Sequence, residues 1–218
     1  MGLVARNNNQ ITYVQLVKGN FRVAQRNADG SPKKDAQGNT LYDLFKELSG
    51  RLSSVATRKR TTTIQGSERE VEDLLLNIVD DKEQVTYILE VDVNGQNAEN
   101  IIMALASATS FSGKEIKIFA WPDKKGDKVY TKVSIHLNGA RLDWAVEPDN
   151  RPAIRKIKYN GQEVSDRTDR INFVKEYISK IQAILAADTT QPVDDAAAAA
   201  GVGVDGFTEG EPEDDLPM

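Results

Sequence analysis

The stretch EIKIFAWPDKKGDKVYTKVSIHL, residues 115–137, decides the fold class of this 218-residue chain. Apolar side chains recur at every second position on both sides of a short charged segment that contains proline and glycine. Because successive side chains of a β-strand point to opposite faces, this period of two predicts two strands, Glu115 to Trp121 and Lys128 to Leu137. A turn over residues 122–127 would join them into a hairpin.

The two faces of this predicted hairpin differ in chemistry. In the first strand, Ile116, Ile118 and Ala120 share one face. The other face is predicted to hold two cations and three aromatic rings: Lys117, Phe119, Trp121, Tyr130 and Lys132. Bases of single-stranded nucleic acid stack on aromatic rings for roughly 1 to 3 kcal/mol each, and cations follow the phosphates. The face is therefore a candidate binding surface; the alternative is that Phe119 and Trp121 pack in the core.

Periodic patterns also cover most of the chain outside this hairpin. Further strands are predicted at residues 11–17, 21–26, 51–65, 71–79, 84–93, 140–146, 155–159 and 162–164. Residues 18–20 would join the first two strands in a hairpin, and residues 27–40 would form a polar loop. Three segments favour helix instead: residues 41–48, stopped by Gly50; residues 98–109, capped by Asn97; and residues 170–187.

The order of these elements predicts the architecture. Strands with a helix in the middle of their order resemble the OB-fold, a small five-stranded barrel. We therefore predict a mainly β fold with helices, an OB-like five-stranded barrel with added strands and a C-terminal helix. A two-layer α+β sandwich is the alternative, because strand order cannot be derived from the pattern alone. Trp144 alternates with Leu142 and Val146 and is predicted to be a core residue.

Two further groups of cations are candidate ligands for phosphate. Arg58, Lys59 and Arg60 lie in the middle of a predicted strand that is polar on both faces. Lys124 and Lys125 lie at the tip of the predicted hairpin. The alternative for the triplet is a solvated charge run that protects a sheet edge, and lysines are common in surface turns.

Enzymatic chemistry has little support in the sequence. The chain has no cysteine and a single histidine, His136, so zinc sites and nucleophilic triads lack their usual residues. It has no glycine-rich phosphate-binding loop and no dinucleotide-binding motif after a strand. We predict a protein that is not an enzyme and needs no cofactor or metal. A metal-dependent nuclease that uses scattered carboxylates is the remaining enzymatic alternative.

Residues 188–218 differ from the rest of the chain in composition. They contain nine of the 33 acidic residues and none of the 28 lysines and arginines, amid alanine, glycine and proline. Such a stretch buries too little apolar surface to offset its ordering entropy, so we predict a disordered tail after an ordered domain of residues 1–187. With 24 acids left, that domain has a net charge of about +4, against −5 for the whole chain. A basic domain attracts phosphates.

The tail ends in a short motif with a functional resemblance. Glu213, Asp214 and Asp215 lead into Leu216, Pro217 and Met218. This ending resembles the conserved tip of bacterial and phage single-stranded-DNA-binding proteins, although Met218 stands where the family usually has phenylalanine. Because the rest of the chain is divergent and has insertions, the phage-encoded members are the most similar. The resemblance implies that the protein coats single-stranded DNA in replication, recombination and repair. It also implies that the tip, Asp214, Asp215, Leu216, Pro217 and Met218, recruits partner proteins. The alternative is an acidic tail that keeps the protein soluble.

The expected partners are therefore single-stranded DNA and replication or repair proteins. The absence of cysteine, of a bilayer-length apolar run and of a signal-peptide pattern predicts the bacterial cytoplasm, including that of a phage-infected host, and no membrane contact. The pattern does not predict an oligomeric state. The alternative function is a protein–protein adaptor whose β-domain binds another protein and whose tail is a solubiliser.

Overall fold

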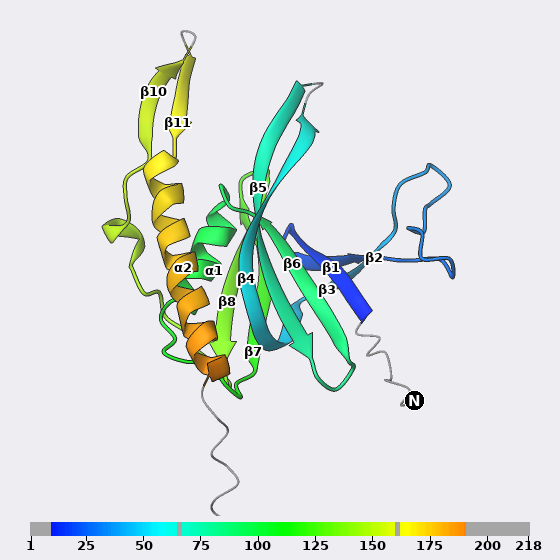
Figure 1. Ribbon diagram of the computed structural model, residues 1–218. Helices are drawn as coiled ribbons and strands as arrows, with labels where there is room; N and C mark the ends of the chain where they lie inside the picture. The colour runs from blue at the N-terminus through cyan, green and yellow to red at the C-terminus, as the bar shows by residue number, and fades with distance from the viewer. Residues whose placement is uncertain (1–9, 65–66, 160–161, 191–218) are drawn as a thin grey trace, which may run out of the picture.

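The computed structural model describes residues 10–64, 67–159 and 162–190 (Figure 1), and the acidic tip lies outside them. The strands are β1 (Gln10–Val17), β2 (Asn20–Ala24), β3 (Tyr42–Phe45), β4 (Glu47–Ile64), β5 (Ser67–Asp80), β6 (Val85–Asp92), β7 (Ile116–Lys125), β8 (Lys128–Leu137), β9 (Ala140–Arg141), β10 (Arg155–Tyr159) and β11 (Gln162–Asp166). The helices are α1 (Gln96–Leu105) and α2 (Thr168–Thr190), and Pro148–Asn150 form a single 3-10 turn. The fold is mainly β with helices, as the sequence predicts.

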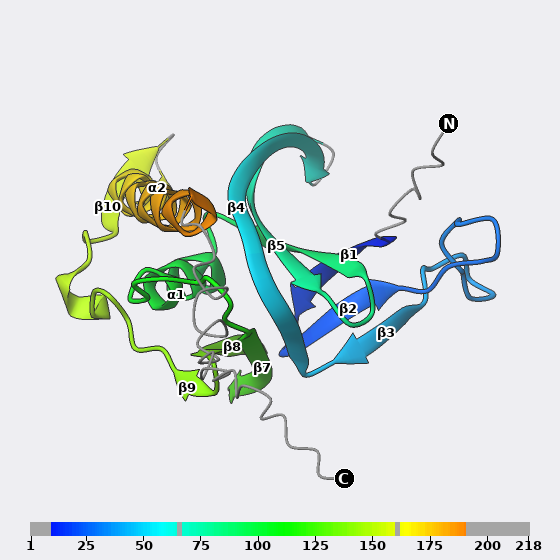
Figure 2. The ribbon, with the colours of Figure 1, turned by 60° about the horizontal axis from the view of Figure 1, so that its bottom comes forward.

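Nine strands form one curled sheet in the order β3-β2-β1-β6-β5-β4-β7-β8-β9. All neighbours are antiparallel except β1 and β6, which run parallel. Figure 2 shows how the sheet curls from β1–β3 through β4 and β5 to β7–β9. Its two edge strands, β3 and β9, do not pair with each other in the described residues, so the sheet is not a closed barrel. The strands β10 and β11 form a separate hairpin.

The long strand β4 connects the two halves of the sheet. Residues 47–50 pair with β7, and residues from Arg51 onward pair with β5. Gly50 lies at the change of partner, with φ of 148°. A Cβ added there would lie 2.6 Å from the carbonyl oxygen of Val79, so only glycine lets the two strands approach this closely.

The helix predicted at residues 41–48 is wrong. This segment instead forms β3, the linking residue Lys46 and the start of β4. Its apolar residues recur at helical spacing, but β2 and β7 supply hydrogen-bond partners on either side. Phe45 lies opposite Phe21 in the register, and the carbonyl of Lys46 accepts a hydrogen bond from the Ala120 amide. Gly50 therefore bends a strand and does not stop a helix.

Both helices pack on the same side of the sheet (Figures 1 and 2). Their predicted apolar faces are confirmed: Ile101, Ile102 and Leu105 of α1, with Val174 and Ile178 of α2, are buried in one core with the inward residues of the sheet. The predicted cap at Asn97 is wrong, because α1 begins after Gly95 and has no side-chain cap.

A buried ion-pair cluster ties the segment after β9 to both helices. Glu99 of α1 accepts hydrogen bonds from Arg151 at 2.7 Å and from Arg170 of α2 at 2.5 Å. The ring of Trp144 lies over the guanidinium of Arg151, at 4.9 Å, and is 39% exposed. The prediction of Trp144 as a core residue is therefore wrong. The predicted strand over residues 140–146 is also wrong beyond Arg141. The chain leaves the sheet there, and the Ala145 amide donates a hydrogen bond to the carbonyl of Met103 in α1.

The last helix continues past the predicted end of the domain. Helix α2 runs to Thr190, and Asp188 accepts hydrogen bonds from the amides of Phe111 at 2.6 Å and Ser112 at 3.0 Å. Burial opposes ionisation of Asp188, but these hydrogen bonds outweigh it and hold the pKa of the carboxyl below its ordinary value. Asp188 thus belongs to the folded domain. No helix in the described part of the chain is long and apolar enough to cross a membrane.

Candidate nucleic-acid interface

The β7–β8 hairpin places the predicted aromatic and cationic residues on one face. Trp121 lies opposite Lys132, Phe119 opposite Ser134, and Lys117 opposite His136, and directly opposite residues share a face. Tyr130 joins them opposite Asp123. The reverse face holds Ile116, Ile118, Ala120 and Ile135, all of which are buried. The predicted grouping of Lys117, Phe119, Trp121, Tyr130 and Lys132 on one face of the hairpin is confirmed.

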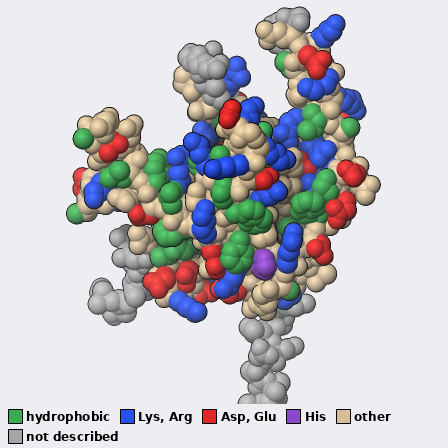
Figure 3. All heavy atoms as spheres, turned by 180° about the vertical axis from the view of Figure 1, so that it is seen from behind, with side chains coloured by type: hydrophobic (Ala, Val, Ile, Leu, Met, Phe, Trp, Pro, Cys, Tyr) green, Lys and Arg blue, Asp and Glu red, His purple; other side chains and the backbone are tan. Residues whose placement is uncertain are grey.

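The rings of this β7–β8 face are accessible. Trp121 is 41% exposed and Tyr130 is 48% exposed. Phe119 is half-buried, and its ring meets the edge of His136 at a centroid distance of 5.1 Å. Figure 3 looks onto this side of the molecule, where hydrophobic side chains lie beside the purple His136, with both basic and acidic side chains around them. The alternative that Phe119 and Trp121 are core residues is wrong.

The lysines of the face have acidic neighbours. Lys132 lies 3.2 Å from Asp123, and Lys117 lies 3.6 Å from Glu47 of β4. Both lysine side chains are more than one third exposed, so these ion pairs contribute little to stability and compete weakly with a phosphate. Glu47 could not be foreseen here, because its segment has the periodicity of a helix.

At the hairpin tip, side chains continue to alternate between the two faces up to the last paired residues, Lys125 and Lys128. The predicted turn at residues 122–127 is shorter in the structure, because β7 continues through Pro122 to Lys125. Lys125 shares the face of Trp121, and its ammonium lies 5.9 Å from the Tyr130 ring, whereas Lys124 is on the reverse face opposite Val129. Lys128, opposite Lys125, adds a further cation. Lys124 therefore cannot act together with these side chains on the same face.

The turn between β1 and β2 braces this hairpin from behind. Gly19 is buried there with φ of 77°, and its amide donates to the Thr131 hydroxyl at 2.8 Å. An added Cβ would lie 2.1 Å from the nitrogen of Pro122 and 2.4 Å from the carbonyl carbon of Trp121. The backbone under Trp121 is thus held by a contact that only glycine permits.

Arg58, Lys59 and Arg60 lie elsewhere, on the β4–β5 arm. Arg58 pairs with Glu90 at 2.6 Å, Lys59 pairs with Glu70 at 2.8 Å, and Arg60 pairs with the buried carboxylate of Asp73. The structure does not bring this triplet to the β7–β8 face, since β4 pairs with β7 only over residues 47–50. Its cations already have acidic partners.

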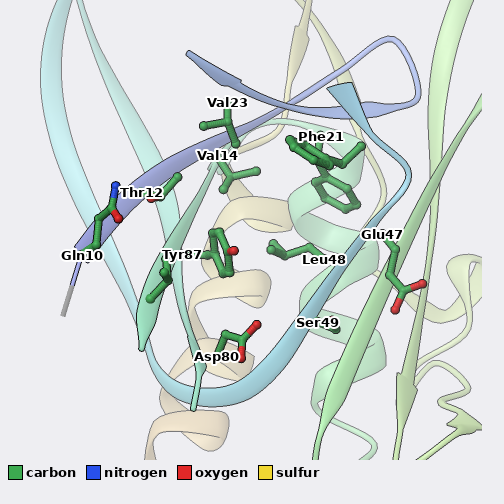
Figure 4. A pocket seen from close by; sticks show the side chains of 12 residues that line it. Gln10, Thr12, Val14, Phe21, Val23, Glu47, Leu48, Ser49, Asp80 and Tyr87 are labelled. Carbon is green, nitrogen blue, oxygen red and sulfur yellow. The ribbon is translucent and has the colours of Figure 1, made fainter. Parts of the chain in front are cut away.

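The sheet also encloses a cavity of about 360 Å³ (Figure 4). Val14, Phe21 and Leu48 contribute apolar lining, and the carboxylate of Asp80 points toward them, whereas that of Glu47 points away (Figure 4). The Tyr87 side chain points into it (Figure 4), and burial, with the nearby Asp80, raises the pKa of its phenol. The carboxylate of Asp80 disfavours a phosphate here, so we do not include this cavity in the candidate interface. Among the described residues, no three of His, Asp and Glu lie together as metal ligands.

Comparison with known proteins gives no match to a family model, to a curated protein or to a solved structure. The function of this protein therefore has to be inferred from its own residues and geometry.

Proposed function

We propose that this protein binds single-stranded DNA without strong sequence preference and that the β7–β8 face is its principal contact surface. One observation carries the proposal: three rings, Phe119, Trp121 and Tyr130, share an open sheet face with Lys117, Lys125, Lys128 and Lys132. Every base has a π-face that stacks on such rings, and lysines bind any phosphate, so this chemistry tolerates all sequences. The protein would coat exposed strands during replication, recombination and repair.

The order of the elements supports this proposal. Three strands, β4, β5 and β6, are followed by α1 and then by β7 and β8, and these five strands are neighbours in the order β6-β5-β4-β7-β8. We interpret them as an opened OB-like unit in which β1, parallel to β6, occupies the side where a barrel would close. The OB-fold is a frequent scaffold for single-strand binding, although a fold alone does not define a function.

The acidic tip has a separate proposed role. Asp214, Asp215, Leu216, Pro217 and Met218 lie outside the described residues, and the resemblance of this motif is the only support for its function. We propose that it recruits replication or repair proteins, with Leu216 and Met218 filling an apolar pocket that has a basic rim. Methionine is flexible enough to fit a pocket shaped for another apolar side chain.

The adaptor alternative has one favourable observation. The edge strand β3 exposes Leu44 by 62% and Phe45 by 49%, and exposed apolar edges are common docking sites for other chains. An adaptor would use this edge and would not bind single-stranded DNA.

A titration of labelled oligo-dT, followed by fluorescence anisotropy at two salt concentrations, tests the proposal. We expect tight binding that weakens with salt, spares duplex DNA and persists in a chain truncated after Thr190. Truncation after Ala187 is unsuitable, because it removes Asp188 from the domain. Absence of binding by both the whole and the truncated chain would overturn the proposal and favour the adaptor.

A further inference from the structure

A second group of rings and arginines lies on the outward face of β1, β2 and β3. Arg22 of β2 lies opposite Gln15 of β1, and its Nε donates to the Gln15 Oε1 at 2.9 Å. Its guanidinium stacks over the ring of Tyr42 of β3 at 4.3 Å. One step further along the strands, Ala24 lies opposite Tyr42, and continuing the β1–β2 register places Tyr13 on its other side.

This row leaves a hollow between two rings. Tyr13 and Tyr42 stand on strands that are separated by β2, which puts their backbones about 9 to 10 Å apart. Between them Ala24 contributes only a methyl group, and a cavity of about 110 Å³ is lined by Tyr13, Arg22, Ala24 and Tyr42, with Arg26 beside them. We call these four lining residues the tyrosine slot.

Core packing does not account for the two rings. The inward face of the same strands is filled by Val14, Phe21 and Val23, whereas Tyr13 is 44% and Tyr42 is 36% exposed. Exposed aromatic residues beside arginines are what a flat, anionic ligand needs, because a base stacks on a ring or a guanidinium plane and its phosphate pairs with the arginines.

The charge of the slot distinguishes it from the cavity of Figure 4. The carboxylate of Asp80 faces that cavity, whereas Arg22 lines the tyrosine slot, Arg26 lies beside it, and no acid lines the hollow. Asp43, the acid nearest in sequence on β3, lies opposite Val23 and therefore on the inward face. Electrostatics thus favours an anionic ligand in the slot.

The slot is also close to the β7–β8 face. Arg22 is three residues from Gly19, which corresponds to about 10 Å along a strand, and Gly19 contacts the backbone of Trp121. Two exposed lysines, Lys18 and Lys46, lie at this turn, and Lys46 donates to the Gly19 carbonyl at 3.0 Å. This turn, with its two lysines, connects the strands of the slot to the back of the hairpin that carries Trp121.

We propose that Tyr13, Arg22 and Tyr42 form a second stacking site for a base of single-stranded nucleic acid, occupied by the continuation of the strand that binds the β7–β8 face. This inference rests on the proposed function, since the same ligand occupies both surfaces. It extends the proposed interface from the β7–β8 hairpin to the outward face of β1, β2 and β3.

Oligonucleotides of two lengths separate this site from the first. We would titrate the full chain with oligo-dT of about 5 and about 20 nucleotides, since single-strand sites usually cover roughly 4 to 16 nucleotides per domain. Tyr13→Ala removes one ring of the slot, and Ala24→Leu fills the hollow between the rings. Each variant is expected to weaken binding of the long oligonucleotide about tenfold and to leave the affinity for the short oligonucleotide unchanged. Leu44→Ala, an exposed change on the same strands, serves as the control and is expected to bind like wild type.

The outcomes are distinguishable from failure of the proposed function. No binding by the wild-type chain overturns both proposals. Wild-type binding that depends on Trp121 but is unaffected by either slot variant overturns only the second site. An equal loss for both lengths also overturns it, because the slot would then not be a separate contact. A change of molecular mass in light scattering with unchanged DNA affinity would show that the surface joins protein chains.

Discussion

The β7–β8 hairpin and the β4–β5 arm are both long antiparallel ribbons with several cations, yet their cations have different surroundings. On the β7–β8 face, lysines stand among exposed rings, and their acidic neighbours are partly solvated. On the arm, Arg58 and Arg60 are engaged with Glu90 and the buried Asp73. The number of cations in a ribbon therefore does not identify a nucleic-acid surface; the side chains beside those cations are the better guide.

The two ribbons also differ in support. The tip half of β7–β8 rests on the β1–β2 turn through Gly19. In the described residues the pairing of β5 with β6 ends at Asp73, so the outer part of the arm is a two-stranded ribbon, tied to α2 by the ion pair of Glu72 with Lys175 at 2.6 Å. A rigid platform suits stacking, because ordering the rings in advance lowers the entropy cost of binding.

The largest effect is expected from removing the brace. Gly19→Ala should lower the free energy of unfolding by roughly 2 to 4 kcal/mol, because the new methyl group meets the backbone of Trp121 and Pro122. Gly38→Ala is the matched control: Gly38 has φ of 85° but nothing within 4 Å of a Cβ, so strain alone should cost about 1 kcal/mol. Denaturant unfolding measures both. Equal losses would show that the close contact contributes nothing.

The next largest effect concerns stacking on the better supported ribbon. Trp121→Ala should weaken binding of oligo-dT by about 10- to 100-fold, because one base loses the indole ring on which it stacks. Trp144→Phe is the control, because Trp144 follows β9, outside the β7–β8 hairpin, and its ring lies over Arg151. Anisotropy titrations measure the oligo-dT affinity of the two variants, and circular dichroism checks that both are folded. A Trp121 variant that binds like wild type would contradict the proposed interface.

A smaller effect separates the cations of the two ribbons. Lys117→Gln with Lys132→Gln should lower the slope of log affinity against log salt by about 1 to 2, because two phosphate contacts are lost. Arg58→Gln with Arg60→Gln should change that slope by less than about 0.5, since those arginines already neutralise Glu90 and Asp73. Titrations at four or more salt concentrations give both slopes. A larger change in the arginine variant would move the interface to the arm.

The smallest effect tests how the arm is attached. The Lys175 ammonium beside Glu72 holds the pKa of that carboxyl below its ordinary value. A lowered pKa in the folded state stabilises the fold above the ordinary glutamate pKa of about 4.3, and this contribution is lost as pH falls through the folded value. The wild-type melting temperature should therefore exceed that of Glu72→Gln by at most about 2 °C near neutral pH, and this difference should shrink progressively as the pH falls below about 4.3. A difference independent of pH would exclude the ion pair as its cause.

The strands on either side of residues 122–127 were predictable because the period of two is strong there and one face is fully apolar. The apolar stripe of α2 was predictable because its apolar residues recur with the helical period of 3.6. The segment at residues 41–48 was not, since Leu41, Leu44, Phe45 and Leu48 recur at helical spacing. Hydrogen bonding to β2 and β7 overrides that local preference, and no pattern within the segment records it.

The sequence by itself determined the faces of individual strands and helices, because side-chain alternation follows from backbone geometry. It therefore placed Phe119, Trp121 and Lys117 on one face before any neighbour was known. Only the tertiary structure decided what lies next to those faces: that Arg58 and Arg60 are neutralised by acids from β5 and β6, and that Gly19 supports Trp121. It also brought Tyr13 and Tyr42 to one slot. Such contacts join residues far apart in the chain, where strand order and register, not local periodicity, set the distances.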